Sequence, residues 1–196
     1  MKKGSIVLVV LLGILLIGGC QACNIQKSLV TLDENAKSKW AEVQNQYQRR
    51  ADLIPNLVNT VKGAANFEQK TLTDVINARA KATSIQVNPD NLTPEKLREF
   101  QNAQGELSQA LGRLMVVSEA YPELKANQNF LALQDQLEGT DNRVTVARKN
   151  FNDAVQEYNT KMRVFPNNIF AGMMGFSAKG MFEADAAAQK APTVQF

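Results

Sequence analysis

A stripe of large apolar residues, repeated every seven positions without a gap, most constrains how this chain can fold. It occupies the C-terminal half of the sequence and consists of Phe130, Leu137, Val144, Phe151, Tyr158 and Phe165. A seven-residue apolar repeat keeps one face of an α-helix against a partner helix along its whole length. We therefore expect one long helix over residues 130–165 that packs lengthwise against other helices.

A second apolar stripe lies between residues 25 and 47. Its members step by three or four positions, and they are Ile25, Leu29, Leu32, Ala36, Trp40, Val43 and Tyr47. This spacing is that of one face of an α-helix. Asp52 and Pro55 interrupt the stripe, so we expect the helix to end there. A second helix, with Asp52 as its cap and Pro55 in its first turn, should then continue to Ala82.

Two proline-containing signals mark the limits of a third helix. Asn88-Pro89-Asp90-Asn91 favours a loop, and the Thr93-Pro94 pair that follows is typical of a helix start with Thr93 as the N-cap. Tyr121-Pro122 ends this helix. Because the connections are short and the helices alternate, we expect an all-α protein with an antiparallel up-down four-helix bundle of long helices over residues 27–165.

The first 26 residues have the organisation of a membrane-targeting segment. Lys2 and Lys3 precede a continuous apolar run from Ile6 to Ile17. Two anchors are compatible with this pattern: an uncleaved transmembrane helix, or a lipoprotein signal whose lipobox-like end makes Cys20 the lipidated N-terminus. In both cases the positive start stays in the cytoplasm, and the helical domain lies on the outer face of the cell membrane.

The length of the apolar segment leaves both anchors open. From Ser5 to Gly19 it would span about 22 Å as a helix, less than the ~30 Å of a bilayer core, which favours a cleaved signal. The polar Gln21 and Asn24 that follow are equally suited to the headgroup zone beside an uncleaved helix.

The chain contains no histidine and only two cysteines, Cys20 and Cys23. Without histidine, catalytic sites of the Ser-His-Asp and Cys-His types and imidazole-bound zinc sites are excluded within this chain. Two thiolates alone do not complete a tetrahedral metal site. A Cys-x-x-Cys redox pair requires a strand-and-helix context, which the end of an apolar helix does not provide. We therefore predict no metal ion and no cofactor.

Neither the glycine-rich phosphate-binding motifs nor the Gly-x-Ser-x-Gly motif of hydrolases occurs in the sequence. We therefore expect no enzymatic activity and no small-molecule substrate. The formal net charge is +3, and setting aside Lys2 and Lys3 leaves 20 basic against 19 acidic residues, a net charge of +1. Because nucleic-acid-binding domains usually carry a basic stripe and a clearly positive charge, we expect no nucleic-acid partner.

A set of polar residues forms a candidate interaction patch. These residues lie at the expected helix ends or on the long C-terminal helix, and they are Arg49, Arg50, Asp52, Glu119, Tyr121, Asn142, Arg143 and Asn159. They have two interpretations. One is that charge-assisted hydrogen bonds tie helix ends together; the other is a recognition surface at one end of the bundle.

Several segments resemble the LemA family of bacterial envelope proteins. They are Tyr47–Gly63, Ala120–Thr140 with Asn142-Arg143, and Asn152–Asn159 with Phe165-Pro166. The resemblance covers about residues 29–176. It implies an N-terminal membrane segment followed by an antiparallel four-helix domain, and it implies no assigned biochemical activity. Most members of the family keep an uncleaved N-terminal helix, a pattern from which the Gly19-Cys20 junction departs.

These patterns predict a membrane-anchored helical protein that presents an interaction or scaffold surface in the cell envelope. Residues 1–26 would form the transmembrane anchor or lipoprotein signal, residues 27–165 the bundle, and residues 166–196 a short apolar segment and a loose tail. The expected partner is an unidentified envelope protein or a second copy of the chain. The alternative function is that of an accessory subunit that docks on a membrane enzyme such as a protease.

Overall fold

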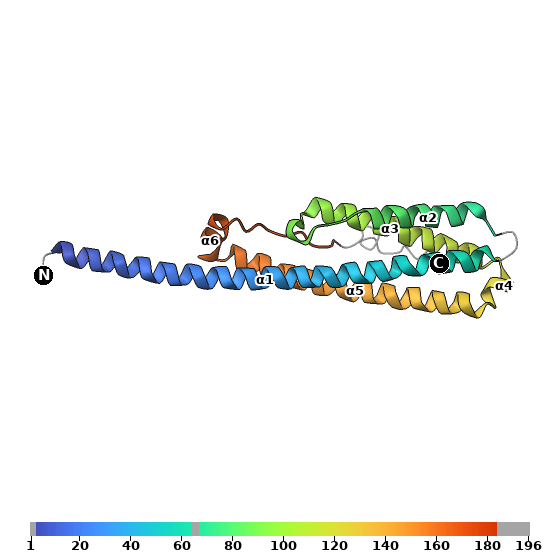
Figure 1. The fold of residues 1–196 in the computed structure, drawn as a ribbon, viewed down its shortest axis with the longest axis horizontal. Helices are drawn as coiled ribbons and strands as arrows, with labels where there is room; N and C mark the ends of the chain where they lie inside the picture. Colours follow the sequence, from blue (N-terminus) through green and yellow to red (C-terminus); the bar gives the residue numbers. More distant parts are fainter. Residues whose placement is uncertain (1–2, 64–66, 184–196) are drawn as a thin grey trace, which may run out of the picture.

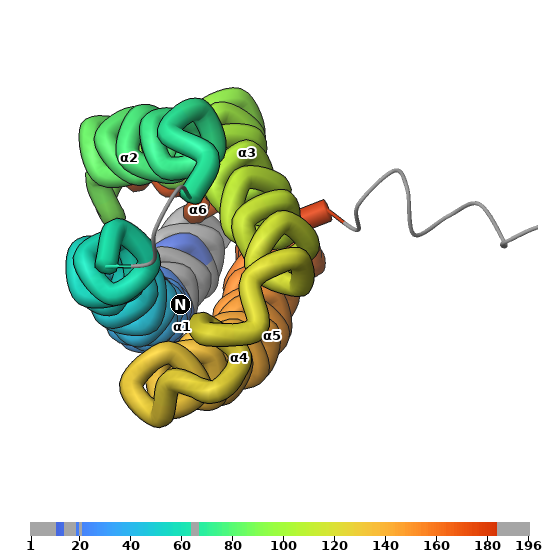
Figure 2. Tube along the Cα trace, turned by 90° about the vertical axis from the view of Figure 1, so that its right-hand side faces the viewer, coloured from blue at the N-terminus to red at the C-terminus, as the bar shows by residue number. Residues whose placement is uncertain are grey.

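The computed structural model describes residues 3–63 and 67–183, and these residues form α-helices and one short 3₁₀ helix without any strand. The all-α prediction is therefore confirmed for the described chain. Four long helices lie side by side (Figure 1), and their end-on arrangement is seen in Figure 2. They are α1 (Lys3–Lys62), α2 (Gln69–Ser84), α3 (Pro94–Ser118) and α5 (Gln128–Arg163).

The N-terminal part of α1 extends beyond the other helices (Figure 1). We call the part before Ile25 the rod, because Ile25 is the first residue of α1 that belongs to a core cluster. We call the rest of the described chain the body. Most side chains of the predicted anchor, that of Cys20 among them, lie outside the described residues, as does the tail over residues 184–196. Within the described part of the chain, no helix has the length and hydropathy needed to span a bilayer.

The helix α1 is continuous over 60 residues, which makes the predicted break at Asp52 and Pro55 wrong. The chain leaves the helix only after Lys62. A proline inside a helix lacks the N–H that would bond to the carbonyl one turn earlier, here that of Ala51. That carbonyl instead accepts a 2.8 Å hydrogen bond from Nε of Arg79 on α2. A contact from another helix thus replaces the missing helical bond and joins α2 to α1.

The two predicted apolar stripes meet where α1 packs along α5. Trp40, Val43 and Tyr47 of α1 share one buried cluster with Val144 and Phe151 of α5. The heptad prediction is confirmed for its first five positions, which are all buried. Its last position, Phe165, is 75% exposed, because α5 ends at Arg163 and the chain then turns away.

The helix α3 begins as the sequence predicts. The hydroxyl of Thr93 accepts a hydrogen bond from the backbone N–H of Lys96, and Pro94 occupies the first turn. A second core cluster follows toward the far end of the body, with members from α1, α2, α3 and α5 that include Leu57, Leu72, Leu114 and Leu137. The short helix α4 (Pro122–Lys125) closes that end (Figure 1) and buries Leu124 in the same cluster.

After α5 the chain folds back along the body. A cis Phe165–Pro166 bond leads into α6 (Asn167–Met173), whose Ala171 packs against Ile25 and Leu29 of α1. An extended segment over residues 177–183, which we call the strap, then runs along the helices away from the rod (Figure 1). The strap passes the 3₁₀ helix η1 (Pro89–Asn91), which belongs to the loop before α3.

We expect the Arg79→Ala substitution to lower the free energy of unfolding by about 1–2 kcal/mol, because it leaves the buried Ala51 carbonyl without a donor. In a Pro55→Ala background the penalty should shrink, since the restored N–H at position 55 bonds to the same carbonyl. Urea unfolding of the full chain in detergent, followed by Trp40 fluorescence, measures this double-mutant cycle. An equal penalty in both backgrounds would show that the two contacts are unrelated.

Candidate interaction site

The structure brings some of the predicted patch residues together and separates the others. Arg50 and the Asn142-Arg143 pair lie near one another in the middle of the α1–α5 contact. Glu119 and Tyr121 lie beside α4 at the far end of the body. Asn159 lies about 26 Å along α5 from Asn142, at 1.5 Å per residue. The eight residues therefore do not form one surface at one end of the helices.

Arg50 is 3% exposed and lies where α1, α3 and α5 meet. Its Nη2 donates to the side-chain oxygen of Gln104 at 2.6 Å and to the carbonyl of that residue at 3.3 Å. Its Nη1 donates to Ser108 Oγ at 2.9 Å and to Asp141 Oδ1 at 3.2 Å. These contacts connect three helices through one charged group. Arg50 is therefore a buried connection between α1, α3 and α5, which we call the Arg50 tie. Its charge is not presented to a partner.

The other helix-end residues make local contacts. Arg49 is exposed on α1, and Asp52 accepts a 2.8 Å hydrogen bond from a glutamine one turn earlier. Glu119 forms an ion pair with a lysine of α4. The ring of Tyr121 packs against that of Phe67, with 4.9 Å between the centroids. The contacts of Glu119 and Tyr121 lie at the far end of the body, whereas Arg49 is exposed beside the Arg50 tie.

A groove of about 440 Å³ lies between α1 and α5, one helical turn from Arg50. Its lining is rich in side-chain amides and consists of Glu42, Asn45, Gln46, Asn142, Arg143, Val146, Ala147 and Asn150. The Oε1 atom of Gln46 is buried and has no hydrogen-bond partner among the described residues. Arg143 is exposed and forms no ion pair within that part of the chain. The groove thus combines unused hydrogen-bonding groups, one positive charge and an apolar side at Val146.

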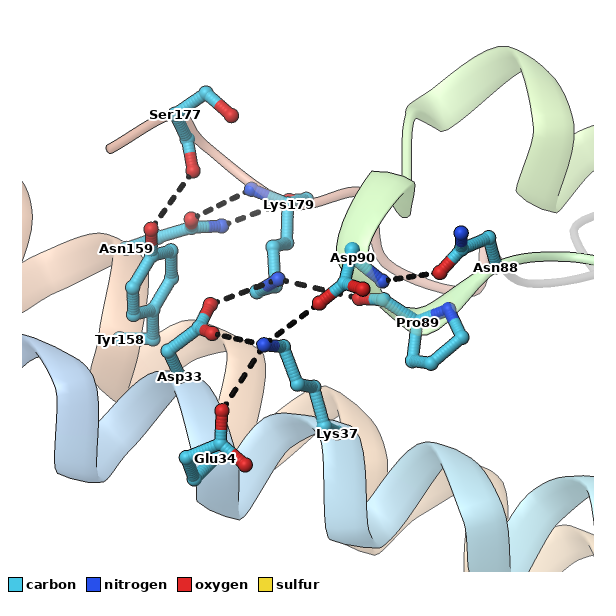
Figure 3. A network of polar contacts seen from close by, with 10 residues as sticks. All are labelled: Asp33, Glu34, Lys37, Asn88, Pro89, Asp90, Tyr158, Asn159, Ser177 and Lys179. Carbon is cyan, nitrogen blue, oxygen red and sulfur yellow. Dashed lines mark hydrogen bonds and ion pairs between the residues drawn. The ribbon is translucent and has the colours of Figure 1, made fainter. Parts of the chain in front are cut away.

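A second polar cluster, which sequence reasoning missed, joins the strap to α1 (Figure 3). Lys179 of the strap donates to Asp33 Oδ1 at 2.9 Å, and Lys37 contacts Asp33 Oδ2 at 2.9 Å and Asp90 at 2.7 Å. Burial alone would raise the pKa of Asp33, but the hydrogen bonds from Lys37 and Lys179 outweigh it and hold that pKa below its ordinary value. Hydrogen bonds to Asp90 and Asp33 raise the pKa of Lys37.

Two asparagines of α5 hold the backbone of the strap. Asn159 donates through Nδ2 to the Lys179 carbonyl at 2.9 Å and accepts through Oδ1 from the Lys179 N–H at 3.0 Å. Asn152 makes the same pair of bonds with Phe182, at 3.0 and 2.9 Å. Because seven residues are about two helical turns, both amides project from one face of α5. They bind an extended segment much as a neighbouring β-strand would.

The strap fits closely against α1 and α3 as well. The ring of Phe182 stacks on that of Trp40, with 6.0 Å between the centroids. The N–H of Gly180 donates to the Leu92 carbonyl at 2.8 Å. A Cβ atom at Gly180 would lie 2.9 Å from Pro94 Cα, closer than real contacts of this kind. The strap therefore requires glycine at this position and an aromatic ring two residues later.

In the described ranges, no three cysteine, aspartate or glutamate side chains are placed to hold a metal ion. The candidate groove offers side-chain amides, one exposed guanidinium and an apolar surface at Val146. This combination is suited to binding a polypeptide segment.

The family model of the LemA family matches residues 39–196. This chain belongs to the LemA family. The resemblance found in the sequence is thus confirmed. The matched range includes the groove and the strap-holding asparagines, whereas Asp33 and Lys37 precede it.

Curated relatives of this LemA family member share about a quarter of their residues with it. It is 24% identical over 173 residues to magnetosome protein MamQ 2 of Paramagnetospirillum magneticum, which covers 80% of this chain and 64% of that protein. It is 24% identical over 142 residues to protein LemA of Metamycoplasma hominis, covering 72% and 61%. The chain therefore spans slightly less than two thirds of the length of these relatives.

The neighbours Arg49 and Arg50 provide a matched pair for testing the buried tie. We expect Arg50→Met to lower the free energy of unfolding by about 2–4 kcal/mol, because Gln104 and Asp141 lose their shared donor inside the body. Arg49→Met should change it by less than about 0.5 kcal/mol, since that side chain is exposed. Urea unfolding of the full chain measures both, and similar losses would contradict the tie.

The low pKa of Asp33 predicts a pH dependence of the strap contact. At pH 7 we expect Asp33→Asn to lower the free energy of unfolding by about 1–3 kcal/mol, because the buried Lys179 loses its charged partner. A lowered folded-state pKa stabilises the protein above the unfolded pKa, and this stabilisation is lost as the pH falls through the folded value.

The difference in unfolding free energy between wild type and Asp33→Asn should therefore become smaller as the pH falls toward about 3. Urea unfolding at both pH values measures it, and comparison with wild type cancels the titration of the other carboxylates. Glu34→Gln is the control, since Glu34 is largely exposed and, among the described residues, forms an ion pair with Lys37 alone. A constant difference between pH 7 and the acidic value would show that the charge of Asp33 does not act on the strap.

Proposed function

We propose that this protein is a non-enzymatic component of the bacterial cell envelope, anchored by residues 1–26, with α1, α2, α3 and α5 as one antiparallel four-helix bundle. In this proposal the groove between α1 and α5 binds an extended segment of another envelope protein. Membership of the LemA family supports the envelope location. The observation that carries the binding role is the amide-lined groove with Arg143, which forms no ion pair among the described residues.

The continuity of α1 supports the anchor. The apolar run from Ile6 to Ile17 belongs to the same helix that later carries Trp40 and Arg50 in the core of the body. The rod extends beyond the other helices (Figure 1), so an apolar segment without a helical neighbour stands at one end of the molecule. Either anchor, a transmembrane helix or a lipid on Cys20, would hold the body outside the cytoplasm, with Lys2 and Lys3 inside.

The groove supports binding of an extended polypeptide because its groups match a peptide backbone. Each amide of Asn45, Asn142 and Asn150 offers both a donor and an acceptor. This chain already uses that chemistry on the strap, where Asn152 and Asn159 each bind one residue through paired hydrogen bonds. The unpaired guanidinium in the groove would add a bidentate contact to a carboxylate of the partner.

The proposed partner contact predicts a site-specific cross-link. A photo-cross-linking residue in place of Arg143, in the full chain in living bacteria, should capture a defined membrane-fraction protein or a second copy of the chain. The same residue in place of Arg113, which is exposed on α3, should not capture it. The Asn150→Ala substitution should weaken the cross-link without changing the amount of folded protein, because it removes one groove amide.

Identical adducts from both positions would contradict a specific groove. Absence of any adduct under several growth conditions, together with a turnover measured on the purified protein, would contradict the non-enzymatic binding role as a whole.

A further inference from the structure

The surface where α5 passes into α6 carries large apolar side chains that are more than half exposed. Phe165, Ile169 and Met173 are 75%, 53% and 81% exposed. Ile169 and Met173 lie four residues apart on one face of α6, and Phe165 lies in the turn before the helix, four residues before Ile169. Apolar side chains exposed at this density indicate contact with an apolar partner.

This surface lies at the end of the body from which the rod emerges. The helix α6 is the element nearest to the rod (Figure 1), and its Ala171 packs against Ile25 and Leu29 of α1. Ile25 follows Gly19, where the apolar segment ends, by about 9 Å along the helix. From Cys20, the alternative lipid-attachment point, the distance is about 8 Å. Both distances are close to the ~6 Å thickness of a headgroup layer.

The charges around α6 are compatible with a membrane surface. Lys161 and Arg163 lie in the last turn of α5, and Lys27 lies on α1 near the contact with α6. All three are exposed, and none forms an ion pair within the described ranges. Exposed basic residues beside a membrane are attracted to anionic lipid headgroups.

We propose that α6 and the turn before it form a lipid-contacting foot. In this foot Phe165, Ile169 and Met173 insert into the interfacial zone of the bilayer, and Lys161 and Arg163 face the lipid phosphates. The inference rests on the proposed anchor and holds for either form of it. A second contact beside the anchor fixes the tilt of the body, because a single helix leaving a bilayer leaves that tilt free. Membrane binding through two contacts, the anchor and the foot, is also tighter than binding through one.

Quenching of tryptophan fluorescence by brominated lipids tests the foot. The full chain, purified with its own anchor, is reconstituted into vesicles of zwitterionic and anionic lipids brominated near the headgroup end of the acyl chain. An Ile169→Trp variant emits from its new tryptophan in addition to Trp40. We expect the brominated lipids to quench about half or more of this additional emission. A Val146→Trp variant, at a similarly exposed position on the middle of α5, should keep its emission. The buried Trp40 provides the common baseline.

A Met173→Trp variant repeats the test at the most exposed position of the foot, where a larger ring meets no packing constraint. Circular dichroism checks that each variant is folded, and intact mass records whether Met1 is retained or Cys20 is lipidated. Equal emission of the foot variants and Val146→Trp, with the chain still bound to vesicles after an alkaline wash, would overturn the foot and leave the anchor in place. Loss of the chain from the vesicles in that wash would overturn both.

Discussion

The assembly of the body depends on the contacts made by the side chain of Trp40. This side chain is fully buried, and its Nε1 donates a 3.2 Å hydrogen bond to the Val87 carbonyl in the loop before α3. Its ring contacts Phe100 of α3, Phe151 of α5 and Phe182 of the strap. One side chain therefore joins segments from the whole length of the chain. An indole can do this because its large apolar area is buried while its single polar group finds a partner.

The helix α1 carries this ring and, on either side of it along the helix, the polar residues that connect α1 to the other segments. Asp33 holds the strap, Arg50 connects α3 and α5, and the Ala51 carbonyl receives Arg79 from α2. Apolar burial supplies most of the stability of such a core. The polar ties add geometric definition, because a buried charged or polar group is satisfied only when its partner lies in one position. The uninterrupted helix places these ties on the same element as the apolar run from Ile6 to Ile17.

The course of the chain after α5 connects the end of the body beside the rod to the core. The helix α6 carries Ile169 and Met173, follows the turn that carries Phe165, and packs against α1 through Ala171. The strap that follows continues to the Trp40 cluster. The asparagines that hold the strap bind an extended backbone, and the α1–α5 groove is lined by side-chain amides of the same kind. In the proposed function, this LemA family member has one face toward lipid and one groove toward a partner.

The sequence by itself determined the helical class, the α5 helix and the start of α3, because apolar periodicity and an N-cap are properties of neighbouring residues. Only the tertiary structure decided that α1 passes through Pro55, since a donor from another helix satisfies the carbonyl that the proline leaves free. It also decided that Arg50 is buried and that Phe165 is exposed at the end of its stripe. The pairing of Lys179 with Asp33 had no local signal. A buried polar group is defined by its partner, and packing alone brings distant partners together.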